Sequence, residues 1–98
     1  MVLFEQRYGV KPDGTKRTHY YVQESCGIAA GFFIAAVHHM GLVTLTHTPS
    51  PMAFLSHLLQ RPEHERPFLV MPVGYPAVGA QVPDLTRKPL DQVLVWAR

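Results

Sequence analysis

Apolar residues along the chain fall into blocks that are separated by polar and proline-containing stretches. The first block, Val2 to Phe4, follows Met1 directly and predicts a buried β-strand. The stretch from Tyr8 to His19 is polar and contains the Asp13-Gly14 turn signal, so it predicts an exposed loop or ribbon. Because the strand has no polar lead-in, we expect the chain to be a piece of something longer.

The longest apolar block predicts a helix from about Val22 to Met40, because this stretch has no proline and Gly41 follows it. From Ile28 to Val37 every face of that helix is apolar, so we expect it to be buried all round. Gly27 and Gly31 leave one side of the helix without bulky side chains, so another backbone can approach it closely. This pattern fits either plain core packing or a subunit interface.

Shorter elements follow the helix. Leu42 to Thr46 is short and β-branched and predicts a strand. Ser50 followed by Pro51 is typical of a helix start, so we expect Ser50 to cap a helix that runs to about Gln60. Phe68 to Val73 predicts a second buried strand.

The C-terminal part of the sequence predicts an arm. Residues Gly74 to Pro89 are rich in proline and show little periodicity, which is typical of an extended segment. The tail from Gln92 to Trp96 predicts a strand, and we expect it to pair with the sheet edge of a partner subunit.

The composition places the chain in one small domain, residues 1–98, that needs a partner. Hydrophobic residues make up 47% of the chain and charged residues 16%, against about 25% charged residues in an ordinary domain. The spare apolar surface is therefore expected to meet another chain. The formal net charge is only +2 and no basic run occurs, so nucleic acid is not an expected partner. The apolar stretch from Cys26 to Val37 is too short to span a bilayer, which predicts a soluble, cytoplasmic protein with no membrane partner.

Few residues form a recognisable catalytic or metal-binding pattern. His38 and His39 are adjacent and point in directions about 100° apart on a helix, so no metal site is expected, and a metal-binding histidine protein is a distant third hypothesis. We interpret Cys26 as a buried structural thiol rather than a nucleophile. Glu63 and Glu65 lie in a proline-flanked stretch that is expected to be exposed.

The segment from Thr44 to Ser50 concentrates hydroxyl groups where a strand meets the expected start of a helix. Free N–H groups and the positive end of a helix dipole suit an anionic or electron-rich ligand edge. Arg87, in the arm, can supply a cation to a phosphate. The alternatives are a helix start that binds nothing and an arginine that faces solvent.

Several segments, in this order, resemble the C-terminal half of the FMN-dependent nitroreductase superfamily, and the iodotyrosine deiodinase-like branch is the closest. The resemblance covers essentially all of the 98 residues. The matching segments are Glu24 to Gly31, Gly41 to Pro49, Arg61 to Glu65, Pro72 to Pro76 and Val82 to Leu90.

The resemblance implies an α+β fold: a nitroreductase-like fragment with a buried central helix, a short mixed sheet and an extended C-terminal arm. It further implies a homodimer with FMN at the subunit interface, in which the arm embraces the partner. Two electrons would pass from NAD(P)H or another reductant to a small aromatic acceptor, either a nitroaromatic, a quinone or a halogenated aromatic compound.

By the same resemblance, four residues would contact the cofactor. Thr46, His47 and Thr48 would line the flavin ring, and the Thr48 hydroxyl or N–H would lie near N5 and act in catalysis. Arg87 would bind the FMN phosphate. His47 stands where the deiodinase-like pattern often has threonine. The family's N-terminal half, with its own phosphate-binding motif and substrate lid, has no counterpart in this sequence.

Two hypotheses follow. In the first, the chain is the C-terminal half of an FMN oxidoreductase and works only with its missing half, in which case the sequence is truncated or one part of a split protein. In the second, it is a non-catalytic remnant or dimerisation module that binds no flavin. Retention of Thr46, Thr48 and Arg87, which packing alone does not require, favours the first hypothesis.

Overall fold

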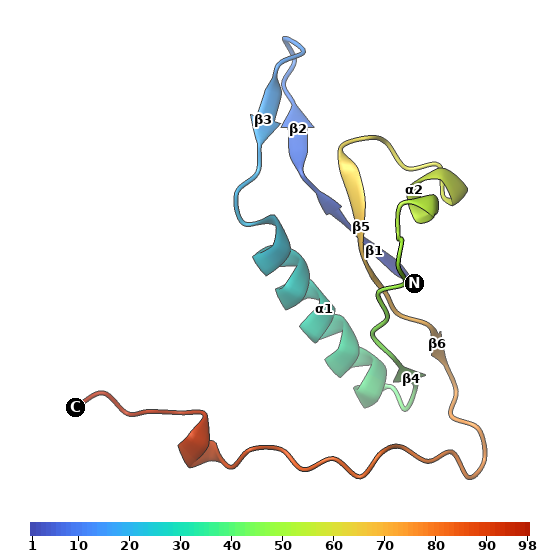
Figure 1. Ribbon diagram of the computed structural model, residues 1–98, viewed down its shortest axis with the longest axis vertical. Helices are drawn as coiled ribbons and strands as arrows, with labels where there is room; N and C mark the ends of the chain where they lie inside the picture. The colour runs from blue at the N-terminus through green and yellow to red at the C-terminus, as the bar shows by residue number, and fades with distance from the viewer.

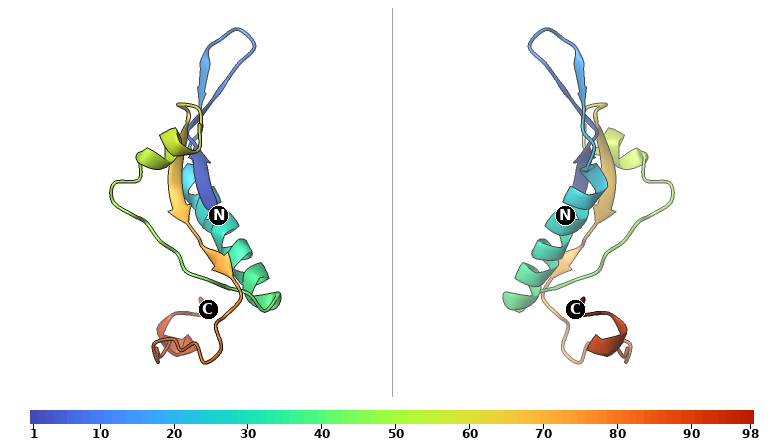
Figure 2. Two further views of the ribbon diagram at one scale, coloured as in Figure 1. Left: turned by 90° about the vertical axis from the view of Figure 1, so that its right-hand side faces the viewer. Right: turned by 90° about the vertical axis from the view of Figure 1, so that its left-hand side faces the viewer.

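The centre of the fold is an antiparallel ribbon of two strands. The structure is a computed structural model and describes residues 1–98. Strand β1 (Val2–Gln6) pairs with β5 (Glu65–Val70), and the register shifts between Leu3 and Phe4. Helix α1 (Val22–His39) lies on one side of this ribbon, and α2 (Phe54–Leu58) lies on the other (Figures 1 and 2). The strand expected at the start of the sequence is confirmed, but Val2, Leu3 and Phe4 are only half-buried rather than buried.

A hairpin projects from the ribbon, as the turn signal predicted. Strands β2 (Tyr8–Val10) and β3 (Lys16–Thr18) pair antiparallel, and the hairpin stands away from the rest of the chain in Figure 1. Gly14 adopts a φ of 85°, a conformation that favours glycine. The Asp13 carboxylate accepts hydrogen bonds from the Thr15 hydroxyl at 2.6 Å and the Thr15 N–H at 3.0 Å.

Helix α1 confirms the expected element but not its expected surroundings. Gly41 has a φ of 76° just beyond the helix and donates its N–H to the His38 carbonyl. Within the helix only Ala30 and Val37 are buried. The side chain of Phe32 is 76% exposed. The expectation of burial on every face is therefore wrong for this chain alone, because the small β1–β5 ribbon can cover only one side of the helix.

The other short elements depart from the expectations in detail. Strand β4 (Val43–Thr44) lies within the strand predicted from Leu42 to Thr46 and pairs with β6 (Val73–Gly74). The single strand predicted from Phe68 to Val73 is divided between β5 and β6. All pairings are antiparallel and form three separate two-stranded sheets, so a single short mixed sheet is not present in this chain.

Helix α2 begins later than predicted. Its N-cap is Ala53, and Ser50 makes no capping hydrogen bond, so the expected Ser50 cap is wrong. The first turn is instead closed by local backbone bonds, of which one runs from the Leu55 N–H to the Met52 carbonyl at 3.0 Å. The Ser50–Pro51 peptide bond is cis.

The C-terminal arm is extended, as predicted, but it does not end in a strand. Beyond β6 it runs away from the sheets and passes below α1 in the view of Figure 1. A 3₁₀ turn, η1 (Leu90–Gln92), takes the place of the predicted strand start. The Val93 and Leu94 N–H groups both bond back to the Leu90 carbonyl. The predicted strand is absent because no other strand of this chain lies beside the tail to pair with it.

The chain exposes far more surface than a closed domain of its mass. Its accessible surface is 8637 Å², whereas a compact monomer of this mass exposes about 5,600 Å². Its radius of gyration is 17.8 Å, against about 13 Å for a compact domain of this length. Only 6 of 98 residues are buried. Packing within this chain therefore leaves a large surface uncovered. No helix here is long and apolar enough to cross a membrane.

Candidate functional site

The hydroxyl-bearing segment that follows β4 is fixed to the central ribbon by one pair of hydrogen bonds. The His47 N–H donates to the Val70 carbonyl at 2.8 Å, and the Val70 N–H donates to the His47 carbonyl at 2.9 Å. In an extended backbone successive side chains point to opposite sides. Thr46 and Thr48 therefore share one side of the segment, and His47 points to the other.

The side chains of this segment are available to a ligand. Thr46, His47 and Thr48 are all exposed, and none of their side chains takes part in a hydrogen bond within the chain. The Thr44 hydroxyl, just upstream, is buried and has no hydrogen-bond partner. Packing within this chain thus leaves the Thr46 and Thr48 hydroxyls without an internal role.

The electrostatics of the segment differ from the prediction. Because α2 starts at Phe54, its positive end does not lie at Ser50, and its five residues form little more than one turn. The expectation of a helix dipole at this segment is therefore wrong. Hydrogen-bond donors here are side-chain hydroxyls, the imidazole and free backbone N–H groups.

Arg87 lies on the arm, apart from the Thr46–Thr48 segment. No hydrogen bond or ion pair joins the two, and Arg87 is exposed and faces solvent in this chain. Thr46, His47 and Thr48 lie together because they are consecutive in the sequence, whereas Arg87 lies in the C-terminal arm. This arm runs away from the strands in Figure 1. The chain by itself does not gather the four predicted residues into one pocket.

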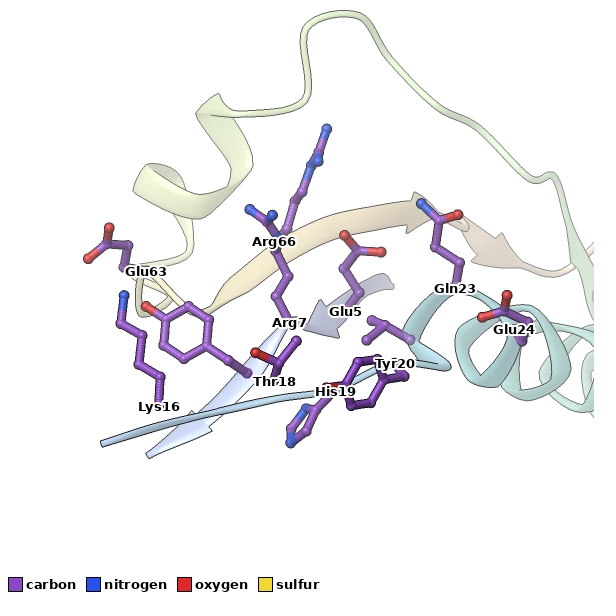
Figure 3. Close-up of a pocket in the computed structure, with 12 residues that line it drawn as sticks. Glu5, Arg7, Lys16, Thr18, His19, Tyr20, Gln23, Glu24, Glu63 and Arg66 are labelled. Atoms are coloured by element: carbon purple, nitrogen blue, oxygen red, sulfur yellow. The ribbon is translucent and has the colours of Figure 1, made fainter. Parts of the chain in front are cut away.

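A polar groove contains residues that the sequence analysis missed. It has a volume of about 700 Å³ and lies between the hairpin, the start of α1 and the start of β5 (Figure 3). Glu5, Arg7 and Arg66 line it, and Glu5 is only 6% exposed. The available signal was a carboxylate directly after the apolar run Val2 to Phe4.

Cys26 has the environment of an unreactive thiol. It is partly buried and lies within electrostatic range of the Glu5 carboxylate. Burial, and secondarily the negative charge of Glu5, raise the pKa of the Cys26 thiol. A raised pKa lowers the thiolate fraction at neutral pH, so this environment disfavours a nucleophilic role.

The remaining titratable residues form no metal cluster. No group of three or more His, Cys, Asp or Glu side chains lies close enough together to hold a metal ion. His38 and His39 are exposed at the end of α1. Glu65 was expected to be exposed in a loop, but it is half-buried at the start of β5 and accepts two hydrogen bonds from Arg61, at 2.7 and 2.8 Å. This ion pair lowers the pKa of the Glu65 carboxyl.

Comparison with known proteins finds relatives that match almost the whole of this chain. No family model matches the chain. An iodotyrosine deiodinase of Haliscomenobacter hydrossis is 65% identical over 95 residues, which cover 97% of this chain and 43% of that protein. Iodotyrosine deiodinase 1 of Homo sapiens is 47% identical over 96 residues, which cover 97% of this chain and 33% of that protein. Over nearly its whole length the chain is similar to iodotyrosine deiodinases, which are members of the nitroreductase superfamily.

The solved structures confirm the fold. A crystal structure of oxidized iodotyrosine deiodinase bound to FMN and 3-iodo-L-tyrosine matches 99% of this chain and 45% of that chain, with a TM-score of 0.75 and 24% identity. The α+β, nitroreductase-like fold class predicted from the sequence is therefore confirmed. The chain spans less than half the length of these iodotyrosine deiodinases.

Proposed function

We propose that this chain forms the C-terminal part of an FMN-dependent oxidoreductase that removes halogen from halogenated aromatic compounds by reduction. The observation that carries the proposal is the 65% identity to an iodotyrosine deiodinase over 97% of the chain. The net reaction replaces a carbon–halogen bond by a carbon–hydrogen bond. It consumes two electrons and one proton and releases halide, with NAD(P)H or another reductant as the electron source.

The donor set of the chain fits FMN. When bound, FMN supplies the two-electron redox chemistry, and the protein supplies position and electrostatics. The Thr46 and Thr48 hydroxyls and the His47 imidazole offer hydrogen bonds to the carbonyl and nitrogen atoms of a flavin ring, and no group of this chain competes for them. The Arg87 guanidinium has no carboxylate partner and suits a phosphate dianion.

Each residue has a distinct role in this proposal. Thr48 holds a donor near N5 of the flavin ring, Thr46 and His47 orient the ring, and Arg87 holds the phosphate. The His47–Val70 backbone pair fixes the segment that carries the ring contacts. Because Arg87 lies apart from that segment, the site closes only when the arm is held by further protein, either a second copy or the companion N-terminal half.

The first test is an absorbance spectrum from roughly 350 to 500 nm, where flavins absorb. The purified chain is mixed with FMN, alone and with a companion polypeptide that covers the rest of the Haliscomenobacter hydrossis relative, and excess FMN is then removed. Retained flavin in either sample supports the proposal, and halide release from 3-iodo-L-tyrosine under a reductant then tests the substrate class. Nitroaromatic and quinone acceptors are assayed in parallel.

A colourless protein in both samples contradicts the proposal. It favours the alternative function, a non-catalytic remnant or dimerisation module, for which the exposed apolar face of α1 is the supporting feature. If flavin is retained but no halide is released, and a nitroaromatic or quinone is reduced, the substrate class in the proposal is wrong and one of these other acceptors takes its place.

A further inference from the structure

The projecting β2–β3 hairpin carries an excess of positive charge. Four basic residues and one acidic residue lie between Arg7 and Thr18, so this segment has a formal net charge of +3, more than the +2 of the whole chain. The acidic residue is Asp13, and its carboxylate is already held by the Thr15 hydroxyl and N–H. The hairpin stands away from the rest of the chain in Figures 1 and 2, and none of its four basic side chains forms an ion pair. Its charge is therefore available to attract an anion.

The strand register divides the basic side chains between two faces of the hairpin. Arg17 is the partner of Gly9, and Lys11, whose N–H continues the hydrogen-bond ladder, follows Gly9 by two residues. Their side chains therefore share the face on which Gly9 leaves a space. Lys16 lies on the opposite face, where its ammonium is 4.5 Å from the centroid of the Tyr8 ring. One face thus presents two cations beside a glycine, and the other presents one cation that an aromatic ring already contacts.

His19 adds a hydrogen-bond acceptor to the face of Gly9. Its Nδ1 lies 2.8 Å from the Gln6 carbonyl oxygen. Because a carbonyl oxygen only accepts, Nδ1 carries the hydrogen, and Nε2 of the neutral ring is the unprotonated acceptor. Nε2 lies beside Gly9, where a Cβ would be 3.4 Å from it. Figure 3 shows the His19 ring pointing away from Arg7 and Glu5, so it faces a hollow separate from the polar groove.

The hollow on this face has the composition of an anion site. Its volume is about 350 Å³, and its lining includes Gly9, Lys11, Arg17 and His19 but no carboxylate. Arg offers a planar fork of N–H donors and Lys a point charge, and both bind phosphate in proteins. Two fixed cations and one acceptor nitrogen match an anion with two negative charges and one hydroxyl hydrogen. Hydrogen phosphate has this composition, whereas sulfate has the charge but no hydrogen.

We infer that this hollow binds a phosphate group, with Arg17 and Lys11 holding its oxygens and His19 Nε2 accepting a hydrogen bond from its hydroxyl. The phosphate belongs either to a soluble ligand or to a phospholipid headgroup, which present the same chemistry to these side chains. The site is distinct from the FMN phosphate contact proposed at Arg87, which lies in the C-terminal arm. The inference holds whether or not the chain binds FMN.

The test is a titration of the flavin-free chain with inorganic phosphate at pH 7 and roughly 0.15 M salt. The NMR signals of the Gly9 amide and the His19 ring should shift. Arg17→Gln should weaken binding by about ten- to a hundredfold and Lys11→Gln by about three- to tenfold, because each removes charge-assisted hydrogen bonds. Lys16→Gln is the matched control. It removes the same charge from the opposite face and should change the affinity by less than about twofold, since salt screens exposed charges.

Sulfate is the matched control ligand, and it should bind about tenfold more weakly than phosphate because it has no hydrogen to donate to Nε2. Equal affinities for the two anions would overturn the role given to His19. The inference is also wrong if phosphate shifts neither signal. It is equally wrong if Lys16→Gln weakens binding as much as Arg17→Gln, because the effect would then come from the overall charge of the hairpin. Loss of phosphate binding in Arg87→Ala would place the anion at the arm instead.

Vesicles that contain phosphatidic acid distinguish the two sources of phosphate. If the chain sediments with them, and Arg17→Gln reduces this binding while Lys16→Gln does not, the phosphate is that of a headgroup. If the chain binds inorganic phosphate but not the vesicles, the ligand is soluble. Either result supports the site. Flavin absorbance is recorded on separate samples, so that loss of phosphate binding at the hairpin is distinguished from failure of the proposed FMN site.

Discussion

His47 and Val70 exchange both backbone hydrogen bonds, at 2.8 and 2.9 Å, although neither β4 nor α2 reaches that position. This pair ties the connection between β4 and α2 to the central ribbon. It therefore sets the position of Thr46 and Thr48, which flank His47 in the sequence. The proposed flavin contacts depend on a backbone interaction rather than on side-chain packing.

We predict that His47→Pro lowers FMN affinity about tenfold. Proline removes the N–H that bonds to the Val70 carbonyl, and one such bond contributes about 1 kcal/mol net. His47→Ala, the control, keeps both backbone bonds and measures what the imidazole contributes. Affinities are measured by flavin fluorescence titration of the flavin-binding assembly. Equal losses for both variants would assign the effect to the imidazole and not to the backbone pair.

Arg87→Ala is expected to weaken FMN binding by about ten- to a hundredfold, because charge-assisted hydrogen bonds contribute roughly 1.5–3 kcal/mol. Riboflavin, which lacks the phosphate, is the matched control ligand, and its affinity should not change. Arg87→Lys should recover part of the FMN affinity, since it keeps the charge but not the planar fork. A variant that loses FMN and riboflavin equally would show that Arg87 acts on the ring or on the fold.

Local features of the sequence predicted local structure well. The Asp13-Gly14 signal and the Gly41 position needed only short-range geometry, and both are observed. The predicted start of α2 was wrong. Ser50 is of a residue type that often caps helices, but backbone hydrogen bonds beginning at Met52 close the first turn instead. The residue type indicates which positions can cap a helix, but it does not determine at which residue the first turn of the helix begins.

Features that depend on other chains could not be predicted in the same way. The tail after Pro89 has the sequence of a strand, but a strand requires a neighbour, and this chain provides none. The groove at Glu5 was missed for a related reason. Its residues come from segments far apart in sequence, and only the β1–β5 register brings Glu5 opposite Arg66.

The Arg61–Glu65 ion pair predicts a pH-dependent contribution to stability. Hydrogen bonds from Arg61, together with its charge, hold the pKa of Glu65 below its usual value, which is about 4.3 for an unperturbed glutamate. The stabilisation is therefore present above that value and is lost as the pH falls through the lowered pKa. Glu65→Gln should lower the urea midpoint at pH 7, and the difference should close below about pH 4.

The control for this prediction is Glu63→Gln, which removes an exposed carboxylate that has no ion pair. It should leave the urea midpoint unchanged at both pH values. A difference between Glu65→Gln and the unsubstituted chain that persists at low pH would assign the effect to packing rather than to charge.

The apolar face of α1 predicts self-association. Ile28 is 64% exposed and Phe32 is 76% exposed, and contiguous apolar surface on a small protein marks an interface. We expect light scattering at micromolar concentration to show a dimer or larger oligomer. Phe32→Glu should shift it toward the monomer, whereas Val10→Glu, on the projecting hairpin, should not. If the unsubstituted chain is a monomer at this concentration, the prediction is wrong.

Cys26 is expected to react slowly with iodoacetamide at pH 8. Burial, and then the charge of Glu5, raise the pKa of its thiol and so reduce the reactive thiolate. Glu5→Gln should accelerate alkylation by roughly two- to threefold, because the larger effect of burial remains. Glu24→Gln, an exposed substitution near the same end of α1, is the control. Equal rates for Glu5→Gln and the unsubstituted chain would show that burial acts alone.

The extended arm also makes assembly visible to an isotope experiment. Between Tyr75 and Lys88 the only backbone hydrogen bond joins the Ala80 N–H to the Ala77 carbonyl. Amides that lack such bonds exchange with deuterated water at nearly the rate of an unfolded peptide. In the free chain the arm should therefore label within the first time point, ahead of α1. Once another subunit holds it, the same amides should become slow, so mass spectrometry of arm peptides reports directly on how much of the protein is assembled.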